Sequence, residues 1–252
     1  MSSLSLVSVN IERSKHLQRV KPFLESARAD VVCMQELMEY DVPFFEELLG
    51  TECHFAPETR HPAEGRPCIM GNGIFSQLPV AAYAERYYHG SREEMHDFDF
   101  TNTDTKEKTE ARVASFIDVE KDGTPFRIIT THFTWTPRGG ADDYQRRDVK
   151  LLLDILAQAG EFVLTGDFNA PRMHEGKPGE IFAAIAAAYK DNIPSNYETS
   201  IDPQYHRAPF DEIKDKMVDG LFTTPSYVAS DVALHNGVSD HCGVTATISR
   251  LA

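Results

Sequence analysis

The sequence predicts an α/β (α+β) fold built on mixed or antiparallel β-sheets. Two observations support this: candidate strands outnumber candidate helices, and several neighbouring strands have no helix between them. A doubly wound parallel sheet would need a long crossover between successive strands. No Pro-, Gly- or Ser-rich linker divides the chain, so a single domain spanning residues 1–252 is expected.

The spacing of apolar residues gives the expected elements in chain order. Helices are expected at 14–29, 37–50, 142–158 and 181–189, each with one apolar face. Strands are expected at 4–10, 30–36, 71–76, 80–88, 111–119, 126–133, 162–167, 216–222, 228–234 and 244–248. The stretches 59–71 and 89–110 are rich in charge, and the first also in Pro and Gly, so both are expected to be surface loops.

The composition is that of a soluble globular protein. Hydrophobic residues make up 41% and charged residues 25% of the 252 positions, which argues against disordered and membrane-spanning classes. The first ten residues lack the basic start and long apolar run of a secretory signal. The four cysteines form no CxxC pair, which favours free thiols in a reducing compartment. We therefore expect a cytoplasmic monomer, unless a secretion signal was removed before Met1.

The net charge weighs on the choice of partner. Lys and Arg total 25 against 39 for Asp and Glu, giving −14, which repels a polyanion and argues against tight non-specific DNA binding. A phosphate-cleaving enzyme is still compatible with this charge, because a bound divalent metal reverses the local sign.

The stretch 162–169 is the strongest chemical signal in the chain. A short apolar strand ends at Gly166, and Asp167 and Asn169 follow at period two, so both side chains face one side. A carboxylate can accept a proton from water, and an amide can orient that water or bind an anionic oxygen. The alternative is that the two residues simply shape a turn.

Other predicted strands also end in polar groups. These are Asn10, Glu36, His132, Asp219, Asp240 and His241. So many carboxylates and histidines at strand ends argue against coincidence. Hard oxygen ligands suit Mg²⁺ or Mn²⁺, whereas zinc would require more His or Cys.

Together these motifs resemble the endonuclease/exonuclease/phosphatase superfamily, which includes pancreatic-type deoxyribonucleases, abasic-site endonucleases and tyrosyl-DNA phosphodiesterases. The resemblance runs through nearly the whole chain, from 8–10 through 34–36, 71–74, 131–132, 166–169 and 218–219 to 239–241. Gly-Asp-x-Asn with a distal Ser-Asp-His is specific, whereas Gln-Glu alone is weak. The resemblance implies a four-layer sandwich of two packed mixed β-sheets flanked by helices, with the site at one mouth.

The resemblance, joined to the chemistry, implies a role for each residue. Glu36, Asn10 and Asp240 would hold the Mg²⁺ or Mn²⁺ against a phosphate oxygen. Asp167 would orient or deprotonate the attacking water, and Asn169 would hold the nucleophile or a phosphate oxygen. His241, paired with Asp219, would bind the phosphate, and His132 would protonate the leaving oxygen. Asp219 could instead be a turn residue, and His132 a hydrogen-bonded group behind the site.

Three further residues are candidates for substrate binding. Asn72 resembles a substrate-side Asn of the superfamily, although an Asn between two glycines also suits left-handed backbone. Arg112 would reach a phosphate or pair with an acid. Trp135 would stack on a base or leaving group, or anchor its loop.

We therefore expect a metal-dependent phosphoesterase that cleaves a phosphodiester, with nucleic acid or a nucleotide-like diester as first choice. Small sugar or inositol phosphate monoesters come second, and sphingomyelin-type substrates third. A binding module that recognises a phosphorylated ligand without catalysis is the alternative from another class, but it has no need of a water-activating carboxylate. The leaving group depends on loops 59–71, 89–110, 134–142 and 195–213.

Overall fold

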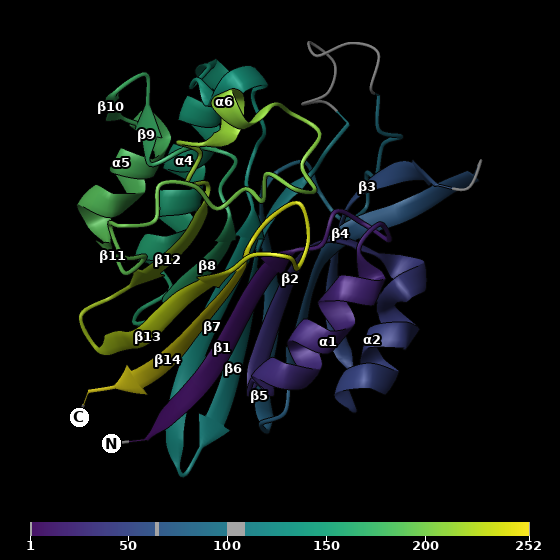
Figure 1. The fold of residues 1–252 in the computed structure, drawn as a ribbon. Helices are drawn as coiled ribbons and strands as arrows, with labels where there is room; N and C mark the ends of the chain where they lie inside the picture. The colour runs from purple at the N-terminus through teal and green to yellow at the C-terminus, as the bar shows by residue number, and fades with distance from the viewer. Residues whose placement is uncertain (1, 64–65, 100–108, 252) are drawn as a thin grey trace.

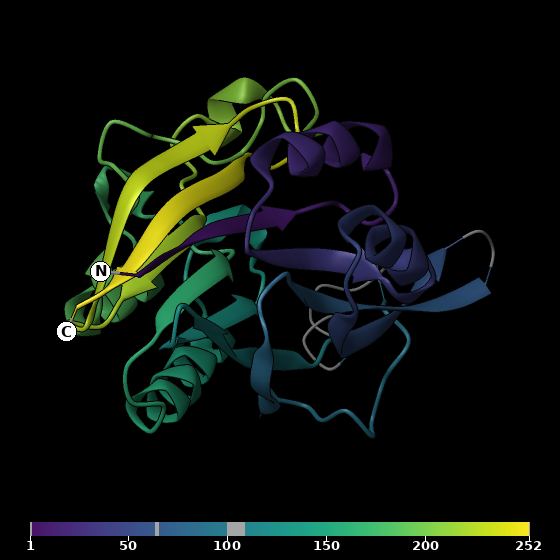
Figure 2. The same cartoon turned by 90° about the horizontal axis from the view of Figure 1, so that it is seen from below.

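The protein is described here by a computed structural model covering residues 2–63, 66–99 and 109–251. Two six-stranded mixed sheets pack face to face. Helices α1 and α2 cover the outer face of one sheet, and α4 lies against the outer face of the other (Figures 1 and 2). This arrangement confirms the four-layer sandwich.

The first sheet has the strand order β13-β14-β1-β2-β4-β3. Its central strands β1 (Ser3–Asn10) and β2 (Val31–Met38) are parallel, and helix α1 (Leu17–Ala27) crosses between them. The other pairings are antiparallel. Its remaining strands are β3 (Cys53–Ala63), β4 (Arg66–Ser76), β13 (Tyr227–His235) and β14 (Gly243–Arg250), and a short turn of 3₁₀ helix, η1 (Glu39–Asp41), and helix α2 (Val42–Leu49) follow β2.

The second sheet repeats this plan in the order β11-β12-β8-β7-β6-β5. Its parallel pair is β7 (Thr124–His132) and β8 (Val163–Asp167), joined by α4 (Asp143–Ala157). The Asp142 side chain caps α4 by accepting from Gln145 N at 2.8 Å. The remaining elements are β5 (Val80–His89), β6 (Arg112–Lys121), η2 (Pro137–Gly139), β9 (Met173–His174), β10 (Lys177–Pro178), α5 (Glu180–Ala188), β11 (Lys190–Asp191), α6 (Phe210–Ile213) and β12 (Asp219–Thr223).

Period-two alternation assigns each strand residue to one of two cores. On β1, Leu4 and Leu6 join the core between the sheets, whereas Val7 and Val9 pack under the helices. On β8, Val163 lies between the sheets and Leu164 under α4 and α5. Later residues of the same parity, such as Asn10 and Asp167, must therefore also project between the sheets.

The prediction of a surface loop at 59–71 is wrong. Strands β3 and β4 form a long antiparallel pair there, from Cys53↔Phe75 to Ala63↔Arg66. Proline and charge are tolerated because β3 is the edge strand, where one side of the backbone needs no partner.

The expected helix at 37–50 begins too early. Leu37 and Met38 still pair with Gly71 and Met70 in the sheet, so α2 starts only at Val42. The expected loop at 89–110 is described in part: residues 91–99 return beside β3, where Phe98 N donates to Arg60 O at 2.7 Å, and residues 100–108 lie outside the described part. Across the described ranges, we find no helix with the length and apolar character needed to span a membrane.

Candidate active site

Three of the predicted residues lie side by side across the second sheet. In the strand register Asp167 pairs with Asp219 on one side and with His132 on the other. All three therefore project into the space between the sheets, and each is at most 4% exposed. This row lies at the carboxyl ends of the parallel strands β7 and β8, and α/β proteins commonly bind ligands at that end of a sheet.

Gly166 is required for this row to form. Its φ is +141°, and a Cβ built there would lie 2.0 Å from the Thr131 carbonyl oxygen on β7. Only glycine fits, because any side chain would overlap the neighbouring backbone. The Gly-Asp step of the motif thus sets where Asp167 leaves the strand.

Asp167 connects the two sheets. Its Oδ2 accepts from Asn10 Nδ2 at 3.0 Å, and its Oδ1 accepts from the Asn169 backbone N at 2.7 Å. Burial alone would raise the pKa of Asp167, but His241, His132 and these hydrogen bonds outweigh it, and the pKa lies below its usual value. Asp167 is therefore an ionised carboxylate that is almost fully buried. The Asn169 side chain donates to Phe133 O at 2.8 Å, and Asn169 adopts left-handed backbone with φ of 49°.

Glu36 reaches the site through a bulge. The register of β2 and β4 shifts between Met34 and Leu37, and Glu36 has a φ of 54°. Its Oε1 accepts from Asn10 Nδ2 at 3.3 Å. Glu12 and Arg13 also have positive φ. The described chain has eight non-glycine residues with left-handed backbone, and four of them, Asn169 included, lie at the site. Strained backbone conformations of this kind are common at functional sites.

His241 is held between three carboxylates. Its Nδ1 lies 2.8 Å from Asp219 Oδ2, and its Nε2 lies 3.7 Å from Asp167 Oδ2. Burial opposes a charged ring, but Asp219, Asp167 and Asp240 raise the pKa of His241 well above its usual value. Ser200 Oγ accepts from the Asp219 backbone N at 3.0 Å and so fixes this pair. The result is a buried imidazolium that can face an anion.

Glu58, which sequence analysis missed, lies behind His132. Its Oε2 is 3.4 Å from His132 Nδ1 and 3.5 Å from Arg112 Nη1, and its Oε1 accepts from Asn72 Nδ2 at 3.1 Å. Burial and Arg112 act to lower the pKa of His132, but Glu58 and Asp167 outweigh them and raise it. No local motif marked Glu58, because it lies in the middle of β3 and its partners are distant in the sequence.

The wall of the site opposite Asp167 offers hard oxygen ligands. Burial, followed by the charges of Glu36 and Glu12, raises the pKa of Asp240 to about 7 despite His241. Glu12, His16 and Asp240 present ligand atoms within 4.8 Å of one another, and so do Asp167, Asp219 and His241. Glu36 is in neither group. Crowded carboxylates that repel one another fit a hard divalent cation such as Mg²⁺ or Mn²⁺, which would favour their ionised forms.

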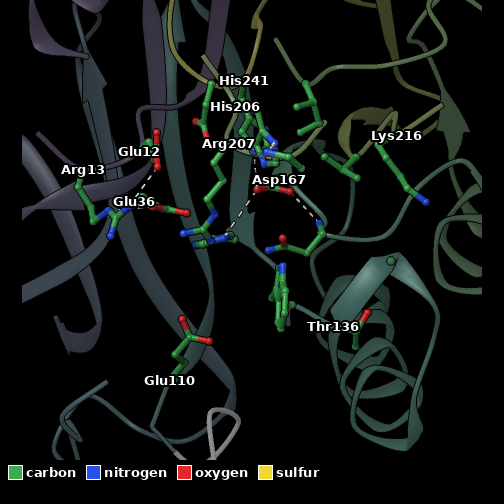
Figure 3. A pocket seen from close by; sticks show the side chains of 18 of the residues that line it. Glu12, Arg13, Glu36, Glu110, Thr136, Asp167, His206, Arg207, Lys216 and His241 are labelled. Atoms are coloured by element: carbon green, nitrogen blue, oxygen red, sulfur yellow. Dashed lines mark hydrogen bonds and ion pairs between the residues drawn. The ribbon is translucent and has the colours of Figure 1, made fainter. Parts of the chain in front are cut away.

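A cavity of about 570 Å³ opens onto these residues (Figure 3). Glu12, Arg13 and Glu36 line one side of it, and Asp167 and His241 lie across from them. Of the predicted site residues, those that line the cavity are Glu36, Arg112, His132, Trp135, Asp167, Asn169, Asp240 and His241. The sheets therefore bring residues from both ends of the chain to one opening.

The three predicted substrate-binding residues differ in their position relative to the cavity. Trp135 is half-buried on the cavity wall, on a loop pinned by Gln145 Nε2, which donates to Thr134 O at 2.6 Å. Arg112 lines the cavity but pairs with Glu110 at 2.7 Å and with Glu58. Asn72 is fully buried behind the cavity. Asn72 lies in β4, where its backbone pairs with Ala56 of β3, and its φ is not positive, so the left-handed alternative is wrong.

Solved structures share this fold along the whole chain. A Beutenbergia cavernae endonuclease/exonuclease/phosphatase has a TM-score of 0.76 at 18% identity, over 100% of this chain and 72% of that one. D. rerio TDP2, in complex with a single-strand DNA product, has a TM-score of 0.66 at 15% identity, over 99% and 100%. Bacteroides thetaiotaomicron mannosyl-6-phosphatase Bt3783 has a TM-score of 0.65 at 14% identity, over 98% and 99%.

The sequence itself gives a further comparison. No curated protein matches the sequence. The sequence model of the Endonuclease/Exonuclease/phosphatase family matches residues 7–241, which span every predicted catalytic and metal-binding residue. The chain belongs to the Endonuclease/Exonuclease/phosphatase family.

Proposed function

We propose that the protein is a divalent-metal-dependent phosphoesterase that hydrolyses a phosphodiester by in-line attack of water. The family includes both phosphodiesterases and phosphatases, so the reaction class has general support. The observation that supports the proposal most strongly is the position of Asp167, an ionised carboxylate at the base of an open cavity, between two histidines.

Asp167 would act on the attacking water. Its carboxylate can orient the water and accept its proton as the bond to phosphorus forms. Asn10 and the Asn169 backbone each donate a hydrogen bond to it, so its direction is fixed before substrate arrives. The Asn169 side chain would help to position the water or a phosphate oxygen.

The two histidines would act on the phosphate and the leaving group. His241, held charged by Asp219, would bind a non-bridging oxygen through Nε2. His132, whose pKa is raised mainly by Glu58 against the effect of burial, would hold a proton for the leaving oxygen. Glu36, Asp240 and Asn10 would hold Mg²⁺ or Mn²⁺, which supplies Lewis-acid stabilisation of negative charge on the phosphate.

A phosphomonoesterase acting on a small sugar or inositol phosphate is the second candidate. Similarity to the mannosyl-6-phosphatase and to TDP2 is nearly equal, with TM-scores of 0.65 and 0.66, so the fold favours neither. The volume of the cavity, about 570 Å³, and the net charge of −14 fit a small substrate at least as well as a long polyanion.

Hydrolysis of an activated aryl phosphodiester, beside the matching monoester, tests the proposal. Each substrate would be assayed with Mg²⁺, with Mn²⁺ and with EDTA. We expect EDTA-sensitive cleavage with higher kcat/KM on the diester. Higher kcat/KM on the monoester would favour the second candidate, and metal-independent turnover would contradict the proposed chemistry.

A further inference from the structure

Arg207 differs from Arg13 and Arg112, which also line the cavity. Arg112 pairs with Glu110 and Glu58, and Arg13 lies 3.2 Å from Glu12 Oε1 and 3.6 Å from Glu36 Oε2. Arg207 makes no ion pair or hydrogen bond with any described residue, although several carboxylates line the same cavity. It is a positive charge that the protein itself leaves available.

The Arg207 side chain points into the cavity. Figure 3 shows it reaching toward the centre, between Glu36 and Asp167. Arg207 is exposed, so its guanidinium stays in water inside the cavity, where an entering anion can reach it. The loop that carries Arg207 sets this position.

The loop at 201–208 is held on several sides. Ile201 pairs with His241 as an isolated bridge, and the Asp202 backbone N donates to Asp240 O at 2.8 Å. The buried Asp202 carboxylate accepts from Gly237 N at 2.6 Å and from Gln204 N at 2.9 Å. The loop is thus tied directly to the segment that carries Asp240 and His241.

The outer part of the loop rests on helix α1. The Arg19 guanidinium carbon lies 3.9 Å from the centre of the Tyr205 ring, and the His16 ring centre is 5.8 Å from it. His206 Nδ1 accepts from the Ala208 backbone N at 3.0 Å, closing the turn around Arg207. Residues on both sides of Arg207 are therefore fixed, while its own side chain is free to bind.

We propose that Arg207 is a substrate-binding residue whose guanidinium contacts non-bridging oxygens of the substrate phosphate. This deepens the proposed function and rests on it. A planar guanidinium matches two phosphate oxygens at once and stays charged at any physiological pH. Its charge would offset the surrounding carboxylates, which otherwise repel the approaching anion.

The test compares Arg207→Gln with Arg207→Lys and with Lys214→Gln. Lys214 is a close control, because its side chain is 52% exposed and Asp211 on α6 is its one ion-pair partner among the described residues. Its substitution makes the same charge change outside the cavity. Two quantities are measured in Mg²⁺ buffer: kcat/KM on an aryl phosphodiester, and the affinity for inorganic phosphate by calorimetry. Melting temperatures check that each variant folds.

We expect Arg207→Gln to lower kcat/KM about 100-fold, the size seen when one donor to a transition-state oxyanion is lost. Phosphate affinity should fall with it, Arg207→Lys should recover part of both, and Lys214→Gln should match the wild type. Equal kcat/KM and equal phosphate affinity in Arg207→Gln and Lys214→Gln would overturn the assignment. Absence of turnover in the wild type would instead reject the proposed function, and phosphate binding that still depends on Arg207 would then support the binding role alone.

Discussion

The two β-α-β units of the molecule, β1-α1-β2 and β7-α4-β8, have the same topology but build unlike walls of one site. Each ends in polar residues at the carboxyl end of a parallel pair. On the first wall the Glu36 side chain is 23% exposed, and Glu12, Arg13 and Glu36 have left-handed backbone. On the second wall the Asp167 side chain is 1% exposed, and Asp167 is the last residue of strand β8.

Under the proposed function, the two walls would have different tasks. An open, carboxylate-rich wall suits a hydrated cation, which keeps several of its own waters. A buried wall suits proton transfer, since charges there are weakly screened and their pKa values are set by neighbouring groups. Asn10 Nδ2, which donates to both Glu36 and Asp167, joins the two walls.

The largest expected effect is on folding stability, and it comes from a substitution in strand β8, which carries the buried Asp167. Gly166→Ala would place a Cβ 2.0 Å from Thr131 O, so we expect a loss of roughly 4 kcal/mol or more in the free energy of unfolding. Gly123→Ala is the control: its φ is +72° but nothing lies within 4 Å, so only about 1–2 kcal/mol of backbone strain is expected. Chemical denaturation measures both. Equal losses would show that close packing against β7 is not what requires Gly166.

The next effect is on rate rather than on folding. Asp167→Asn keeps the shape of the side chain but removes the proton acceptor, so kcat should fall about 10³-fold or more. Asp154→Asn, on the exposed face of α4, should leave kcat unchanged. Steady-state kinetics on the aryl diester measures both. Retention of more than a tenth of the wild-type kcat would remove Asp167 from the chemical step.

A smaller effect, on the pH dependence of kcat, is expected from Glu58, which contacts His132 and has no proposed contact with substrate. The pKa of His132 is raised, so its proton is present below that pKa and activity should fall as pH rises through it. Glu58→Gln removes the main raising influence on the His132 pKa, and the alkaline limb of the pH–kcat profile should move to lower pH. An unmoved limb beside the exposed control Glu120→Gln would exclude a role for Glu58 in tuning His132.

Most of the fold and much of the site could be predicted from the sequence. Gly166, Asp167 and Asn169 were accessible because strand periodicity and a local motif act within a few residues. Glu58 was not, because it reaches His132 only through the pairing of edge strand β3, in a segment whose charge suggested a loop. Glu12 was missed for another reason: its left-handed backbone, which turns the chain after β1, leaves no pattern in the sequence.

Manganese binding tests the division between the two walls most directly. Calorimetric titration of Mn²⁺ would be run on the wild type, Glu36→Gln and Asp167→Asn, with turnover measured on the same samples. The account predicts that Glu36→Gln weakens Mn²⁺ binding about 10- to 100-fold, whereas Asp167→Asn binds Mn²⁺ as the wild type does and still fails to turn over. Wild-type Mn²⁺ affinity in Glu36→Gln, together with lost affinity in Asp167→Asn, would contradict it.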